Sequence, residues 1–270
     1  MRIATFKIRG LALIAILGFA VVIFQAASDF ASRSIYDSFD SATEKDLWDM
    51  RKIAPDSWTI QSKEVRDGDG ALCIWLNQGG GVEKDRTGVC TERAEFMEAK
   101  NLYETENEIN EFQFSFYIPN DFPITSTRLI IAQWKQKCEV DDCELDNPVL
   151  AVRYIDHVFQ ITSHTEAGKK ILFETREELR GSWHDFRAEI IFSRKETGRI
   201  RIKIDKKEIV DVTGINAYSV SKDYPDNARF YFKMGLYRDE FPGKMMIFFD
   251  EYRKNKLDKI SLQSAQAKRP

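Results

Sequence analysis

The sequence lacks several features that mark common enzyme classes. It has only three histidines, and no His/Cys grouping has the spacing of a zinc site. No G-x-S-x-G segment is present, which argues against a nucleophile-elbow hydrolase. Helical periodicity is scarce, and neither an internal repeat nor a linker divides the chain. We therefore expect one domain that needs no catalytic metal and no cofactor.

An excess of positive charge is also lacking. The 43 acidic residues outnumber the 40 lysines and arginines, which gives a formal net charge of −3. A mildly acidic protein does not attract nucleic acid through its overall field, so we expect no nucleic-acid partner. If the protein binds a polyanion, the cations that do so must be gathered locally.

Only one stretch of the chain is long and apolar. Three basic residues precede the apolar run Leu11–Phe24, and small residues follow it at Ala26–Ser28. This layout is typical of a secretory signal peptide over residues 1–28, and the alternative is an uncleaved membrane anchor. Loss of the leader would take the net charge from −3 to −6, because it carries three cations and no acid. We expect an exported protein, periplasmic or secreted, that is held at a membrane only if the leader stays.

The four cysteines are an even number, which in an exported chain suggests disulfides. We expect Cys73 to pair with Cys90, joining neighbouring strands, and Cys138 to pair with Cys143, closing a short loop. Four cysteines allow three disulfide connectivities, and the sequence alone does not choose among them. Free buried thiols are the alternative to disulfides.

Period-two alternation runs through most of the remaining chain and predicts strands. In Phe112–Ile118 the aromatic and aliphatic residues alternate with polar ones, and Gly-rich turns separate such runs. Ten or more strands without intervening helices predict an all-β fold, namely a concanavalin A-like β-sandwich (jelly roll) of two antiparallel sheets. We expect this domain over residues 29–256, followed by a polar tail at 257–270, and we expect a monomer.

Three of the expected strands have unusual residues on the face that alternation assigns to solvent. Taken singly, each is consistent with the ion pairs of an ordinary solvated sheet. Side by side on one sheet, they would form a cationic cleft that contains a phenol. These faces carry Arg229, Tyr231, Lys233, Gly235 and Tyr237 in the first strand, Gln133 and Lys135 with Ile131 in the second, and Thr91, Arg93 and Glu95 in the third.

These strands resemble those of a known enzyme family. Tyr231–Tyr237 resembles the YFKxGxY strand of jelly-roll polysaccharide lyases that cut alginate and glucuronan. Arg93–Glu95 resembles their R-x-E strand and Gln133–Lys135 their Q-x-H strand, in the same order along the chain. Gly181–Asp185 is similar to a G-x-W-H segment of the heparin-lyase-like branch. The resemblance extends from about Phe39 to Tyr252, with one departure, because a lysine stands at position 135 where the family has histidine.

The resemblance implies a polysaccharide lyase that cleaves a uronic-acid-containing acidic polysaccharide by β-elimination. Tyr237 would be the acid, and also a candidate base, while Gln133 and Arg93 would neutralise the uronate carboxylate. Lys135 is the alternative base. Residues that contact substrate or support the site would be Lys233, Glu95, Tyr231, Arg229 and His184.

Two other functions fit parts of the sequence. The stretch Glu139–Glu144 matches E-x-D-x-x-E, which resembles the carboxylates of laminarinase-like glycoside hydrolases on the same type of sandwich. It also reads as a solvated acidic loop, or as a site for a structural calcium ion. The lysine at position 135 leaves open a lectin-like protein that binds a glycan without cleaving it.

Overall fold

The computed structural model describes residues 34–257, except residues 45, 51–52, 54–55, 86–87, 139–146 and 220–227 and the side chain at position 138. The described residues contain no α-helix, and none of their helical segments is long and apolar enough to cross a membrane. The expected leader and most of the expected tail lie outside the described residues.

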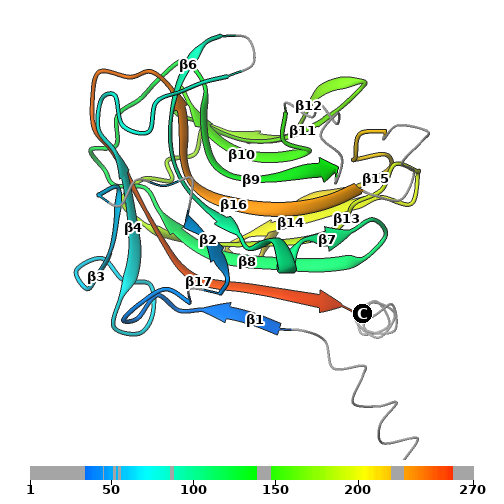
Figure 1. The fold of residues 1–270 in the computed structure, drawn as a ribbon, viewed down its shortest axis with the longest axis horizontal. Helices are drawn as coiled ribbons and strands as arrows, with labels where there is room; N and C mark the ends of the chain where they lie inside the picture. The colour runs from blue at the N-terminus through cyan, green and yellow to red at the C-terminus, as the bar shows by residue number, and fades with distance from the viewer. Residues whose placement is uncertain are drawn as a thin grey trace, which may run out of the picture. The chain divides into compact units, whose positions relative to one another are not determined.

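The strands form two antiparallel sheets that lie face to face (Figure 1). Sheet A follows the order β15 (Lys207–Thr213), β14 (Arg199–Ile204), β13 (Trp183–Ile191), β8 (Ile109–Tyr117), β17 (Met245–Leu257), β4 (Ala71–Leu76) and β3 (Trp58–Gln61), with β1 (Ser34–Asp37) beside β17. Sheet B follows the order β12 (Gly168–Thr175), β11 (Val158–Thr165), β10 (Leu150–Ile155), β9 (Leu129–Cys138), β16 (Ala228–Asp239), β6 (Cys90–Glu98) and β2 (Trp48–Asp49). Two short strands extend it, β5 (Glu83–Lys84) beside β6 and β7 (Glu104–Thr105) beside β16, and a 3-10 turn, η2 (Lys100–Leu102), precedes β7.

The core between the sheets is built from the apolar sides of alternating strands. Phe112 and Phe114 of β8 meet Trp134 of β9 and Phe232 of β16, and the Trp134 and Phe232 rings lie 4.9 Å apart. Each such burial contributes roughly 1.5–3 kcal/mol to folding. Trp134 is fully buried in this core, on the face of β9 opposite Gln133 and Lys135.

Residues before the first long strand also pack into this core. Phe39 and Trp48 are buried, and their rings lie 6.4 Å apart. This segment therefore packs against the sandwich, and it contains the two short strands β1 and β2.

Strand β16 needs a glycine at the point where it passes β6. Gly235 has φ +139, and a Cβ there would lie 2.2 Å from the carbonyl oxygen of Ala94. Any other residue would push the two strands apart. Because Gly235 stands two residues before Tyr237, this close approach helps to fix the distance between Tyr237 and the side chains of β6.

A register shift in β9 corrects one assignment of faces. Ile131 belongs to the core cluster, whereas Ile130 lines the opposite face of sheet B. The pairings of β9 with β10 and with β16 both shift at this point. The expectation that Ile131 shares a face with Gln133 is therefore wrong, because a bulge interrupts the alternation that the sequence pattern assumes.

Candidate active site

The face of sheet B turned away from sheet A is hollowed into a cleft of about 650 Å³. Its walls come from β6, β9, β10 and β16, with contributions from β5, β12 and the segment before β9. The lining includes six cationic side chains and two carboxylates, so it is strongly positive although the chain is acidic overall. The cations are Lys84, Arg93, Arg128, Lys135, Arg153 and Lys169, and the carboxylates are Glu83 and Asp85.

The three strands that were expected to converge are neighbours. The order in sheet B is β9, β16, β6, and the register places Lys233 opposite Gln133 on one side and Tyr237 opposite Arg93 on the other. Gln133, Arg93, Lys135 and Tyr237 all line the cleft. The predicted convergence is therefore observed for these four residues.

The phenol of Tyr237 lies between two guanidinium groups. Arg128 donates a hydrogen bond from Nη1 to the phenolic oxygen over 2.8 Å, and the Arg93 guanidinium carbon lies 4.4 Å from the ring centroid. A cation over a ring face and a cationic donor at its oxygen are both attractive contacts. They fix the hydroxyl in the cleft.

Arg128 is itself held by two carboxylates. Its Nη1 lies 2.9 Å from Asp85 and its Nε lies 3.1 Å from Asp239. Burial disfavours the charged form of Arg128, but the contacts with Asp85, Tyr237 and Asp239 outweigh burial and raise its pKa. Arg128 is thus a rigid donor that stays charged.

Glu95 organises the floor of the cleft. It is 1% exposed, accepts a hydrogen bond from Gln133 Nε2, and lies 3.2 Å from Arg93 Nε and 3.6 Å from Lys233 Nζ. A buried carboxylate with these partners pins all three side chains in one arrangement. These contacts agree with the expectation that Glu95 supports the site, and they show that it orients Arg93.

Other predicted residues of β16 have a supporting position. Lys233 is buried against Glu95, and Tyr231 stacks on Tyr103 with ring centroids 4.8 Å apart. Burial raises the pKa of Tyr231, which makes it a poor proton donor. Arg229 pairs in register with Thr105 of β7. Lys233, Tyr231 and Arg229 do not line the cleft.

His184 was expected near the cleft, and this placement is wrong. It lies on β13 of sheet A, where its Nδ1 is 2.7 Å from Asp205 and its ring lies 5.6 Å from that of Phe116. Alternation showed that β13 was a strand but could not show to which of the two sheets it belongs.

The predicted disulfide between Cys73 and Cys90 is also wrong. Both are free thiols, and they lie in different sheets, on β4 and on β6. Burial raises the pKa of the Cys73 thiol to about 11. The predicted pair of Cys138 and Cys143 lies outside the described side chains.

The acidic stretch Glu139–Glu144, which suggested a hydrolase or a calcium ion, lies outside the described residues as well. Within residues 34–257 as described, no group of three or more His, Cys, Asp or Glu side chains is arranged to hold a metal ion.

Two cleft arginines were not predicted from the sequence, Arg128 and Arg153. Arg153 could have been found, because Val152 and Tyr154 face the core and the residue between them must face the cleft. Arg128 precedes the first residue of β9 and so follows no strand pattern. Arg128 can be placed beside Tyr237 only once the pairing of β16 with the start of β9 is known.

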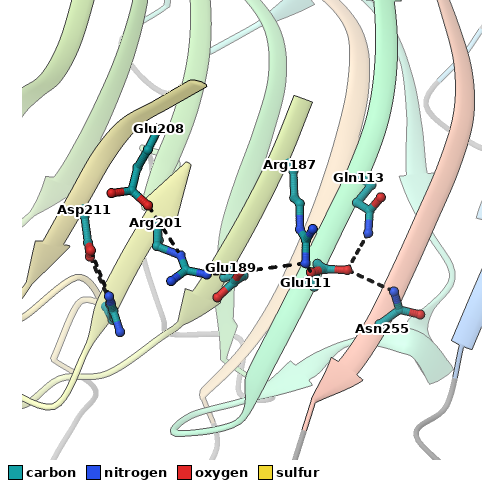
Figure 2. Close-up of polar contacts among 9 residues, drawn as sticks. Glu111, Gln113, Arg187, Glu189, Arg201, Glu208, Asp211 and Asn255 are labelled. Carbon is teal, nitrogen blue, oxygen red and sulfur yellow. Dashed lines mark hydrogen bonds and ion pairs between the residues drawn. The ribbon is translucent and has the colours of Figure 1, made fainter. Parts of the chain in front are cut away.

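The outer face of sheet A has a second depression, of about 560 Å³, but its charges are largely paired. Arg66 makes two hydrogen bonds of 2.9 Å to Asp185 there. Figure 2 shows an adjoining row of side chains on β15, β14, β13, β8 and β17, in which opposite charges contact one another and two neutral amides donate hydrogen bonds to Glu111. This face offers less surplus charge to an anionic ligand than the cleft of sheet B. The row includes Asp211, Glu208, Arg201, Glu189, Arg187, Glu111, Gln113 and Asn255.

Comparisons with known proteins identify the family of the whole domain. The family described as polysaccharide lyase matches residues 35–253, whereas no curated protein matches the sequence significantly. The endo-β-1,4-glucuronan lyase of the fungus Trichoderma reesei is similar in structure, with a TM-score of 0.63 at 18% identity, over 83% of this chain and 96% of that chain.

Two alginate lyases have the same fold. Alginate lyase A1-II′, a member of polysaccharide lyase family 7, has a TM-score of 0.54 at 13% identity, over 75% of this chain and 85% of its own. A variant of alginate lyase Aly36B in complex with an alginate trisaccharide has a TM-score of 0.55 at 11% identity, over 83% and 98%. The predicted jelly-roll sandwich is confirmed, and the finer likeness to heparin lyases is not.

Proposed function

Because the chain belongs to the polysaccharide lyase family and is thus an enzyme that acts on polysaccharides, we propose that it cleaves a polymer of uronic acids by β-elimination in the cleft of sheet B. The observation that carries this proposal is the phenol of Tyr237, which lies between Arg93 and Arg128 in a cleft lined mainly by cations. A polyanion is the ligand that such a lining attracts.

The reaction needs a base that removes the proton at C5 of the uronic acid and an acid that protonates the leaving oxygen at C4. When the C5 proton leaves, negative charge develops on C5 and on the adjacent carboxylate, and this charge must be stabilised. Tyr237 supplies the acid through its hydroxyl and, when deprotonated, the base. Lys135, on the same cleft face, is the alternative base.

Arg93 and Gln133 are the proposed partners of the carboxylate at the bond that breaks. Both are tied to the buried carboxylate of Glu95, so their positions are set before substrate arrives. An arginine and an amide in fixed positions can stabilise the developing charge without rearranging during the reaction.

The proposed function is tested by incubating the protein with glucuronan, alginate, a heparin-type chain and a neutral β-glucan. We expect new ultraviolet absorbance from an unsaturated uronate with glucuronan, with alginate or with both, because every sugar of these two continuous polyuronates is a uronic acid. New reducing ends without that absorbance would indicate a hydrolase instead. Binding without either product would indicate a lectin-like protein.

We expect Arg128→Gln to lower kcat about tenfold or more, because the phenolic oxygen loses the donor that fixes it. KM should change far less, since Arg128 is engaged with Asp85 and Asp239. Arg128→Lys should recover part of the rate, and Arg187→Gln on sheet A serves as a control of equal charge change. A rise in KM with kcat intact would contradict this role.

Export is the remaining part of the proposal. It rests on the basic, apolar and small-residue pattern of residues 1–28, and it agrees with a polymer substrate that is too large to enter a cell unaided. N-terminal sequencing of the protein recovered from its natural compartment would test it, with a mature chain that begins near residue 29 as the expected result.

A further inference from the structure

Arg153 differs from the other two cleft arginines because no described carboxylate lies beside its charge. It lies on β10, lines the cleft, and donates a hydrogen bond from Nε to the hydroxyl of Thr162 over 3.1 Å. Among the residues that the structure describes, no acidic side chain pairs with it. Arg93 and Arg128, by contrast, each contact two carboxylates.

The surroundings of Arg153 oppose its charge. Burial is the larger cause and the nearby cation of Arg128 the second, and together they lower its pKa to about 10, although Tyr237 partly offsets them. The side chain is therefore still protonated at neutral pH, but at a cost to the free energy of folding that no described carboxylate offsets. An anionic ligand in the cleft would relieve that cost.

The strand register aligns Arg153 with the catalytic tyrosine. Arg93, Tyr237, Ile130 and Arg153 form one row across β6, β16, β9 and β10. Neighbouring strands are about 4.8 Å apart, so Arg153 is two strand spacings from Tyr237, with the apolar Ile130 between them. Arg93 lies on the other side of Tyr237, three strands away from Arg153, and is held there by Glu83 and Glu95.

We propose that Arg153 binds a carboxylate of the sugar next to the one that is cleaved, and so selects polymers that carry a carboxylate on successive sugars. With Nε bound to Thr162, its two terminal nitrogens form the edge that can hold a carboxylate bidentately. This inference rests on the proposed function, because it assumes that a polyuronate occupies the cleft.

The test compares Arg153→Gln with the wild type on the continuous polyuronate that the wild type cleaves best. A contact outside the reacting sugar contributes to binding in the ground state and the transition state alike, so KM should rise about tenfold or more with kcat changed little. Arg153→Lys keeps the positive charge but loses the planar guanidinium that can bind a carboxylate bidentately. Its KM should therefore lie between those of the wild type and Arg153→Gln. A fall in kcat with an unchanged KM would overturn the proposal.

Lys169→Gln is the matched control, since it removes one exposed cation from the same cleft. Its KM should rise clearly less than that of Arg153→Gln. Equal effects of the two substitutions would mean that only the general field matters, and would overturn a direct contact.

Thermal unfolding without substrate separates a binding role from a structural one. Arg153→Gln should unfold at the same temperature as the wild type or higher, because it removes a poorly compensated charge. A lower unfolding temperature would mark Arg153 as structural and overturn the inference. If the wild type releases no unsaturated uronate from any polymer, the proposed function fails first and this inference with it.

Discussion

Tyr237→Phe is expected to reduce the elimination rate by two to four orders of magnitude, the loss that accompanies removal of a general acid or base, about 10²–10⁴-fold. The substitution deletes only the hydroxyl that accepts the hydrogen bond from Arg128. The ring remains, so its contact with Arg93 is retained. Release of unsaturated uronate, followed by its ultraviolet absorbance, is the measurement.

Folding and substrate binding should survive this change. Arg128 keeps both of its carboxylate partners, so the lost hydrogen bond is expected to cost about 1 kcal/mol of unfolding free energy or less. Substrate affinity should therefore be close to that of the wild type in a direct binding measurement.

Tyr231→Phe is the matched comparison, because it removes a hydroxyl from the same face of the same strand. Tyr231 is packed against Tyr103 and does not line the cleft, so most of the activity should remain. If Tyr231→Phe abolished activity while Tyr237→Phe retained it, the assignment of the two tyrosines would be reversed.

Alternation along the strands predicted which side chains face the core and which face solvent, and it did so well for the long, strongly patterned strands. Ala94 and Phe96 are buried, as expected, beneath the polar face that carries Arg93 and Glu95. This pattern is local, because each side chain points opposite to its neighbour along the strand. The pattern can therefore be recognised in the sequence without knowledge of the tertiary structure.

Edge strands were harder to predict. Strands β12 and β15 were not anticipated, and both lie at the ends of their sheets. Their residues are largely half-buried or exposed, so the contrast between apolar and polar positions is weak. A strand with little contrast in burial between its two faces gives a weak periodic signal.

Sheet membership could not be predicted at all from single strands. In a sandwich, alternation distinguishes inward from outward residues but does not say which of two sheets a strand joins. The misplacement of His184 and the wrong pairing of Cys73 with Cys90 both follow from this gap. The convergence of β6, β16 and β9 was predicted correctly because a family resemblance supplied the missing long-range information.

A buried ion cluster was missed for the same reason, since its members come from distant parts of the chain. Glu98 of β6 and Glu104 of β7 both contact the ammonium of Lys254 on β17, and all three are at most 5% exposed. Glu98 also accepts hydrogen bonds from the Tyr252 hydroxyl and from the backbone N–H of Phe232 on β16. The cluster therefore joins sheet A to β16, the strand that carries Tyr237.

Lys254→Met is expected to destabilise the protein by about 3–5 kcal/mol, the cost of leaving a buried charge without its partner. Here two carboxylates lose the ammonium that they share. For a domain of this size, the loss corresponds to a fall in unfolding temperature on the order of 10 °C, measurable by calorimetry.

Lys256→Met is the matched control, because it lies two residues along the same strand with an exposed side chain paired to Glu108. An exposed ion pair of this kind contributes about 0–1 kcal/mol. Adding Glu104→Gln to Lys254→Met should restore part of the stability, since it removes one of the stranded charges. Equal destabilisation by Lys254→Met and Lys256→Met would mean that the cluster contributes nothing beyond an ordinary surface pair, and that β16 is held against sheet A by the aromatic core alone.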